Sequence, residues 1–146
     1  MSSPFRTPAD YELFLYGIRE QFPFIVRSTL TLVRRGASLA RITGDLYFAQ
    51  AIRLIVRERI IYDRLPVVID AYGYEVWQRE EKLCWYDSQP HPNDSLLQST
   101  HPHHKHIPPD PKHHRIPAAV LSFTQPNLPV LIEEIHRLLK QQEAES

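Results

Sequence analysis

The stretch AIRLIVRERIIYD, residues 51–63, decides the fold because apolar and charged residues alternate along it. Such alternation is typical of a β-strand that has one buried side and one solvent-facing side. The sequence therefore predicts a long strand in a sheet that is covered on one face. The side predicted to be buried carries Ile52, Leu54, Val56, Ile60 and Tyr62, and the other side carries Arg53, Arg57 and Arg59 with Ile55 and Ile61.

Four further strand-like segments surround this strand. They are rich in β-branched and aromatic residues, and short polar turns such as RRGAS at 34–38 and REE at 79–81 separate them. Because strands joined by such short connections pair with their neighbours, the pattern predicts an antiparallel meander over residues 24–87. The segments are IVRSTLTLV at 25–33, LARITGDLYF at 39–48, VVIDAYGYEVWQ at 67–78 and KLCWYDSQ at 82–89.

A helix is predicted at each end of the sheet. Thr7 and Pro8 are typical of a helix start, so the first helix is expected over residues 8–22. The second is expected over residues 127–142, with Asn127 as its cap. The predicted fold class is α+β, as a single domain over residues 1–146 in which one curved antiparallel sheet of about five strands is flanked by both helices. The buried sides are Tyr11, Phe14, Leu15, Ile18 and Phe22 in the first helix, and Leu131, Ile132, Ile135, Leu138 and Leu139 in the second.

The composition is that of an ordinary globular domain, with 42% hydrophobic and 23% charged residues and a formal net charge of zero. Zero net charge gives no general preference for nucleic acid, but residues 1–64 hold ten arginines against six acidic residues. Arginine suits contacts with phosphate or carboxylate. The single cysteine, Cys84, excludes an internal disulfide and a cysteine-based zinc site. We find no signal peptide or membrane span, so we expect a cytoplasmic protein without a membrane partner.

Residues 88–117 form a predicted loop that is rich in histidine and proline. Its stretch STHPHHKHIPPDPKHH, at 99–114, holds six of the eight histidines of the chain. One interpretation is a metal site, although the spacing matches no specific zinc signature. A second is cleavage of RNA without metal, in which histidines act as acid and base beside Lys105. A third is a solvated or partner-binding surface loop, which needs no chemistry.

Polar residues on the predicted strands offer further candidates. Glu58 lies on the side predicted to be buried, where a carboxylate is costly unless it is paired. It is either structural, in a salt bridge to an arginine or at a strand end, or functional, as a base or a group that orients a histidine. Asp70, Tyr72 and Tyr74 are predicted to share one side of the next strand, where tyrosines either contact a nucleotide or serve as ordinary sheet residues. Asp87 stands at the entrance of the histidine loop, where it could fix an imidazole tautomer.

Several segments together resemble the TumE-like family of toxin components in bacterial toxin–antitoxin pairs. The resemblance extends over about residues 25–139 and is carried by LIVRE, YGYEV, WYDSQPHP, STHPHHKH and a terminal LIEEI. The chain departs from the pattern by an extended segment, IPPDPKHHRIPAA, after the histidine core. The resemblance implies a growth-inhibiting toxin that is neutralised by an antitoxin and is expected to cleave RNA. The corresponding positions are Tyr86 and Asp87, Pro90 and His91, Pro102–His106, the strand glutamate Glu58, and the aromatic pair Tyr72 and Tyr74.

The residues and the resemblance together predict a metal-independent endoribonuclease toxin that needs no cofactor. Two alternatives stay open: a non-catalytic RNA- or protein-binding module with a histidine-rich contact loop, and a metal-dependent hydrolase. No residue is assigned to a metal. The catalytic candidates are His103, His104 and His106 as acid and base, Lys105 at the phosphate, Asp87 or Glu58 to orient an imidazole and Tyr74 to stack or donate a hydrogen bond; the substrate-binding candidates are Arg57, Arg59, Tyr72, His91 and His101.

The expected partners are a cognate antitoxin and an RNA substrate, and a homodimer is left open. The arginines of residues 51–63 suit an acidic surface. We therefore expect an acidic antitoxin to cover the side of the strand that carries Arg53, Arg57 and Arg59.

Overall fold

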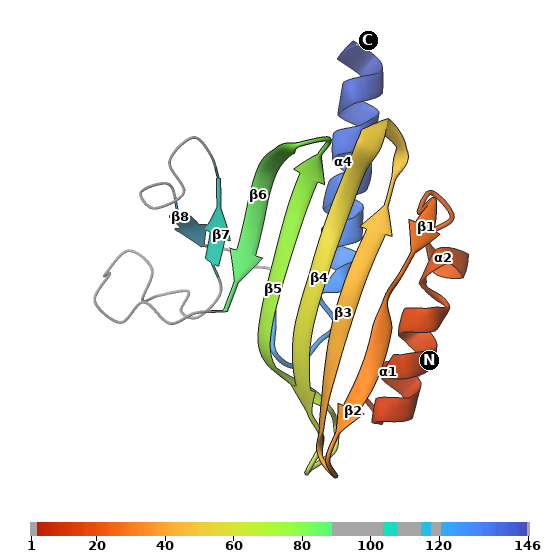
Figure 1. Cartoon of the computed structure of the whole chain (residues 1–146), viewed down its shortest axis with the longest axis vertical. Helices are drawn as coiled ribbons and strands as arrows, with labels where there is room; N and C mark the ends of the chain where they lie inside the picture. The colour runs from red at the N-terminus through yellow and green to blue at the C-terminus, as the bar shows by residue number, and fades with distance from the viewer. Residues whose placement is uncertain (1–2, 89–103, 108–114, 118–120, 146) are drawn as a thin grey trace.

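The computed structural model describes residues 3–88, 104–107, 115–117 and 121–145. Within these ranges one antiparallel sheet forms the body of the molecule (Figure 1). The strand order is β1-β3-β4-β5-β6-β7-β8, and β2 also pairs with β3. The predicted α+β class with a single antiparallel sheet is therefore confirmed. The strands are β1 (Arg27–Ser28), β2 (Thr31–Arg35), β3 (Leu39–Tyr47), β4 (Ile52–Ile61), β5 (Val68–Gln78), β6 (Glu81–Asp87), β7 (His104–His106) and β8 (Arg115–Pro117).

Two strands fall inside the segment that was predicted to be a loop. β7 pairs with β6, and β8 pairs with β7, both antiparallel. The prediction of a structureless loop over residues 88–117 is therefore wrong at these positions. Prolines flank residues 104–106 but none lies among them, so their backbone groups are free to pair. Pro117 ends β8, which is an edge position that a proline tolerates.

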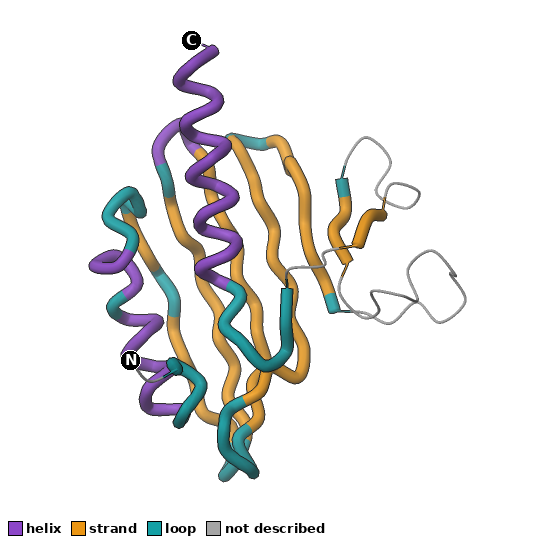
Figure 2. The backbone as a smooth tube through the Cα atoms, turned by 180° about the vertical axis from the view of Figure 1, so that it is seen from behind, coloured by secondary structure: helices purple, strands orange, loops and turns teal. Residues whose placement is uncertain are grey.

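The helices lie on one face of the sheet, as the view from behind shows (Figure 2). α4 (Leu128–Glu145) buries the predicted stripe, including Leu131, Ile135 and Leu139. The predicted N-terminal helix is divided into α1 (Pro8–Tyr16) and α2 (Ile18–Gln21), with Gly17 between them. Tyr11 and Leu15 of α1 and Ile18 of α2 still share one side across the break and enter the core, where each is at most 1% exposed. A short 3-10 helix, η1 (Ala49–Ala51), joins β3 to β4.

Alternation along β4 divides the sheet into a covered and an open face. Ile52, Leu54, Val56 and Ile60 are buried under the helices, as predicted. We define the open face as the opposite side, with Arg41 and Thr43 on β3, Arg57 and Arg59 on β4, Ala71, Gly73 and Glu75 on β5, and Trp85 and Asp87 on β6.

Asp70 does not share a side with Tyr72 and Tyr74, contrary to the prediction. The register of β4 against β5 shifts between Arg59 and Ile60, so that Arg59 pairs with Ala71 while Ile60 pairs with Ile69. This irregularity leaves Asp70 exposed while Tyr72 and Tyr74 are buried. None of the helices in the described ranges is long and apolar enough to span a membrane.

Candidate functional site

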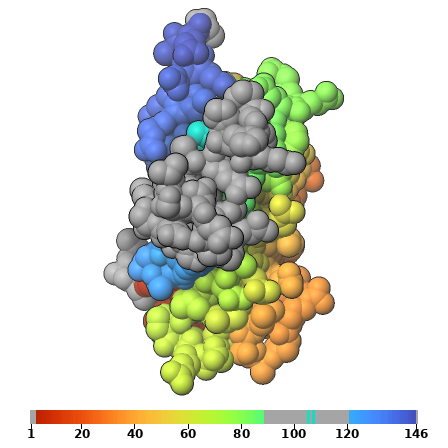
Figure 3. All heavy atoms as spheres, turned by 90° about the vertical axis from the view of Figure 1, so that its left-hand side faces the viewer, coloured from red at the N-terminus to blue at the C-terminus, as the bar shows by residue number. Residues whose placement is uncertain are grey.

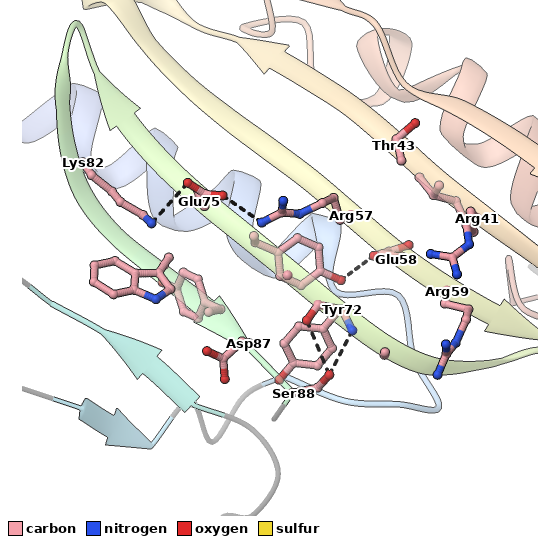
Figure 4. A pocket seen from close by; sticks show the side chains of 16 residues that line it. Arg41, Thr43, Arg57, Glu58, Arg59, Tyr72, Glu75, Lys82, Asp87 and Ser88 are labelled. Carbon is pink, nitrogen blue, oxygen red and sulfur yellow. Dashed lines mark hydrogen bonds and ion pairs between the residues drawn. The ribbon is translucent and has the colours of Figure 1, made fainter. Parts of the chain in front are cut away.

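The open face carries a hollow of about 550 Å³ between β3 and β6 (Figure 4). Its floor is low because Ala71 and Gly73 occupy successive open-face positions of β5 and have almost no side chain. Longer side chains from β3, β4 and β6 form its walls. These include Arg41, Thr43, Arg57, Arg59, Lys82, Trp85 and Asp87.

Most cations of the hollow are held by carboxylates. Arg57 Nη2 donates to Glu75 Oε2 at 2.8 Å, and Lys82 Nζ lies 3.2 Å from Glu75 Oε1. Arg59 Nε donates to Asp70 Oδ2 at 2.6 Å. Burial alone would raise the pKa of Glu75, but hydrogen bonds from Trp77 and Lys82 outweigh burial and hold that pKa below its ordinary value. Arg41 differs, because its side chain makes no ion pair or hydrogen bond with any residue in the described ranges.

The β6–β7 register brings the histidine segment to the edge of this face. His104 pairs with Asp87, and His106 pairs with Trp85. Both partners line the hollow. The sequence-predicted Asp87 therefore lies on the strand next to the glycine and alanine floor, and His104 and His106 lie on the strand beyond it.

Lys105 occupies the alternate position of β7, opposite Tyr86. Its Nζ lies 2.6 Å from Glu134 Oε1 on α4, and the Tyr86 hydroxyl donates to the same oxygen at 2.7 Å. In the space-filling view β7 borders helix α4 (Figure 3). The lysine that was predicted to stabilise a phosphate thus contacts the helix on the covered face and does not line the hollow.

Glu58 is 4% exposed and lies in the middle of β4, facing the helices. Tyr11 of α1 donates to its Oε1 at 2.5 Å, and Tyr74 of β5 donates to its Oε2. Asn127 Nδ2 in turn donates to the Tyr74 hydroxyl at 3.2 Å. Burial raises the pKa of Glu58, while the two tyrosine hydrogen bonds partly oppose that rise.

These contacts rule out both structural interpretations of Glu58 that the sequence offered. Its partners in the described ranges are tyrosines, so the prediction of a salt bridge to an arginine is wrong, and so is that of a strand end. Asn127 stands directly before α4, as predicted, and its backbone oxygen accepts from Leu131 N at 3.2 Å. Its side-chain Oδ1 accepts from Ser122 N at 2.8 Å. The cluster joins α1, the sheet and the start of α4.

Tyr72 and Tyr74 lie on the covered face. Their rings stack with centroids 5.0 Å apart, and Tyr72 also packs at 5.9 Å against Phe123. Burial and the charge of Asp87 raise the pKa of Tyr72. Tyr74 is fully buried and its hydroxyl donates to Glu58, so the Tyr74 hydroxyl is not open to a ligand in the hollow.

Three predicted site residues, His91, His101 and His103, lie outside the described residues. In the part of the chain that is described, no three His, Cys, Asp or Glu side chains come close enough to hold a metal ion. The candidates predicted from the sequence did not include Arg41, Gly73, Lys82 and Glu134. Strand alternation carries a signal for Arg41 and Gly73, whereas only the packing of α4 reveals Glu134.

Comparison with known proteins identifies the family. The sequence profile described as Toxin TumE matches residues 15–139, which is most of the chain. The chain belongs to the TumE toxin family. Membership in the TumE family suggests the toxin of a toxin–antitoxin system and implies a cognate antitoxin as partner. Comparisons with curated proteins and with solved structures gave no significant match.

Proposed function

We propose that this TumE-family toxin is an endoribonuclease that cleaves RNA without a metal cofactor, at the edge of the hollow where β6 meets β7. The observation that carries the proposal is the β6–β7 register, which sets His104 opposite Asp87 and His106 opposite Trp85. Two histidines thus belong to a strand next to an arginine-lined hollow. An imidazole titrates near neutral pH, so a pair of them can serve as base and acid in one reaction.

The reaction is an intramolecular transesterification, in which the phosphorus of RNA passes from the 5′-oxygen to the neighbouring 2′-oxygen. One histidine takes the proton of the ribose 2′-hydroxyl, whose oxygen attacks the phosphorus, while the other gives a proton to the departing 5′-oxygen. The products are a 2′,3′-cyclic phosphate and a free 5′-hydroxyl, so atoms and charge balance without an added reactant. Arg57 and Arg59 bind the phosphate chain, and Asp87 orients one imidazole.

The other candidates have supporting roles in the proposal. Glu58 and Tyr74 act as positioning residues, because their hydrogen bond holds β4 against β5 beneath the hollow. Tyr72 has a similar role, because its ring stacks on Tyr74 and it lies near enough to Asp87 for that charge to raise its pKa. Lys105 holds β7 to α4 through Glu134. His91, His101 and His103 stay candidates for substrate contact or proton transfer from their sequence positions.

The direct test replaces His104 and His106 one at a time with alanine and measures cleavage of RNA by purified protein. Loss of general acid or base should slow cleavage by about 10²-fold or more in each variant. The matched control is His136→Phe, because His136 stacks on Phe24 at 4.1 Å and an aromatic replacement keeps that packing. Full cleavage by both alanine variants would refute the proposal and favour a binding module.

The antitoxin is expected to be acidic and to cover the open face. Arg53, Arg57 and Arg59 lie along one side of β4, and the Arg57 side chain is 63% exposed. Reversing all three charges should weaken the toxin–antitoxin complex in a calorimetric titration. An equally tight complex would remove this part of the proposal. The homodimer and the cytoplasmic location stay predictions from the sequence.

A further inference from the structure

We infer that the hollow on the open face is a subsite for one nucleotide of single-stranded RNA, with Arg41 as the ligand of its phosphate. This inference rests on the proposed function, because it names the form of RNA that the toxin takes. It adds residues that lie away from the histidine strand and that no reaction step above uses. Its support is the shape of the hollow, its charge and the spacing of its walls.

The shape comes from the two small residues Ala71 and Gly73 on β5. A Cβ built on Gly73 would meet Arg57 Nε and Nη2 at 3.7 Å, which is ordinary contact. The guanidinium of Arg57 therefore forms a wall directly beside an unoccupied position. Together with Ala71 this leaves about 550 Å³, which falls within the range of sites for small ligands. A ribose or a base can lie against the bare strand there.

The pairing of charges in the hollow favours an anion beside Arg41. Four cations line it, namely Arg41, Arg57, Arg59 and Lys82, and the carboxylates within or beside it are Glu58, Glu75, Asp87 and Asp70. Glu75 is shared by Arg57 and Lys82, and Asp70 is held by Arg59. Arg41 is left without an acidic partner among the described residues. A phosphate beside Arg41 would supply this acidic partner and accept two guanidinium hydrogen bonds.

The spacing of the walls favours a single strand. Arg57 and Arg59 are on β4, and Trp85 and Asp87 are on β6, with β5 as the floor between them. Strands two apart in a sheet are separated by about 10 Å. That opening admits one nucleotide of a flexible strand, whereas a duplex is wider and keeps its bases stacked inside.

Fluorescence anisotropy with 2′-fluoro RNA tests this inference, because RNA without a 2′-hydroxyl binds but is not cleaved. Gly73→Val should fill the hollow and weaken binding of the single strand about tenfold, while Gly73→Ala should change binding little. Arg41→Ala should weaken binding and lower the slope of log affinity against log salt by about 0.7. Arg19→Ala, a change of an exposed arginine on α2, should leave both unchanged.

Two results would overturn the inference. One is unchanged single-strand binding in both Gly73→Val and Arg41→Ala, with unfolding curves that match the parent protein. The other is equal or tighter binding of a 2′-fluoro duplex of the same length. If Gly73→Val does not fold, Arg41→Ala alone decides. If the histidine variants cleave RNA as fast as the parent protein, the proposed catalysis by histidine is refuted. The binding curves still test the nucleotide subsite in that case.

Discussion

Lys105 Nζ lies 2.6 Å from Glu134 Oε1, so the lysine of the histidine segment is held by helix α4. The Tyr86 hydroxyl donates to the same carboxylate oxygen, and the Lys105 ammonium lies 5.3 Å from the Tyr86 ring centre. The contact ties β7 to the covered side of the sheet. We propose that Lys105 is a positioning residue, whereas the sequence predicted a phosphate contact.

Glu134→Gln and Lys105→Met should therefore slow RNA cleavage to a similar extent. Each breaks the same contact and loosens β7, while unfolding free energy changes by less than about 1 kcal/mol because the pair is partly exposed. Hydrogen exchange of the β7 amides should accelerate in both variants. If Lys105 instead binds the phosphate directly, only Lys105→Met will slow cleavage, since Glu134→Gln leaves the cation in place.

Glu58 should make the stability of the fold depend on pH. Burial raises the folded-state pKa of Glu58 above its ordinary value of 4.5, so the folded chain binds this proton more tightly than the unfolded chain. The resulting stabilisation is complete below the ordinary value and is lost as the pH rises through the raised one. Glu58→Gln lacks this dependence. Urea unfolding from pH 4 to pH 8 should show the parent protein losing stability relative to Glu58→Gln. If the free energies of unfolding of the two proteins changed in parallel with pH, the raised pKa of Glu58 would be contradicted.

Tyr11→Phe should destabilise the fold by about 1.5–3 kcal/mol, because it removes a hydrogen bond to a buried carboxylate and leaves Oε1 without that donor. Tyr47→Phe is the matched control. The Tyr47 hydroxyl donates to Asp45 at 3.2 Å in a part-buried place, so its loss should cost less than about 1 kcal/mol. Chemical unfolding of both variants provides the comparison. An equal loss of unfolding free energy in the two variants would show that the Tyr11–Glu58 hydrogen bond stabilises the fold no more than an ordinary part-buried one.

Gly44→Ala should destabilise the fold by about 3 kcal/mol or more. A Cβ at this position would lie 2.5 Å from Thr29 O and 2.7 Å from Leu30 Cα, and the φ angle is +143°. Gly36→Ala is the control, because Gly36 also has a positive φ of 74° but has open space around its Cβ position. That change should cost only about 1 kcal/mol. Thermal unfolding should separate the two variants clearly, and similar melting temperatures would show that the chain relaxes at Gly44.

Particular residues show how far the sequence alone could predict this structure. The alternation of residues 51–63 predicted β4 and its buried side, including the position of Glu58, because strand geometry is local. The partner Tyr11 lies 47 residues away in the chain and had been assigned to an apolar helix side, so its hydrogen bond required the packed fold. Asp70 was misplaced because a one-residue register shift has no clear local signal.

The candidate site was predictable in part for similar reasons. Arg57, Arg59 and Asp87 follow from alternation along single strands. The position of His104 and His106 beside them depends on β7, which has only three residues and little propensity of its own. The hollow depends on the small size of Ala71 and Gly73 on β5. Strand alternation places both on the open face, but neither is a reactive residue that would be chosen as a site candidate.

The most direct test of the account is cleavage of RNA by the purified toxin in excess EDTA, with analysis of the new ends. If histidines catalyse an intramolecular transesterification, cleavage should persist in EDTA and leave 2′,3′-cyclic phosphate and 5′-hydroxyl ends. It should be lost in His104→Ala and His106→Ala. The contradicting result is an inactive protein in EDTA whose cleavage returns only with added zinc or manganese.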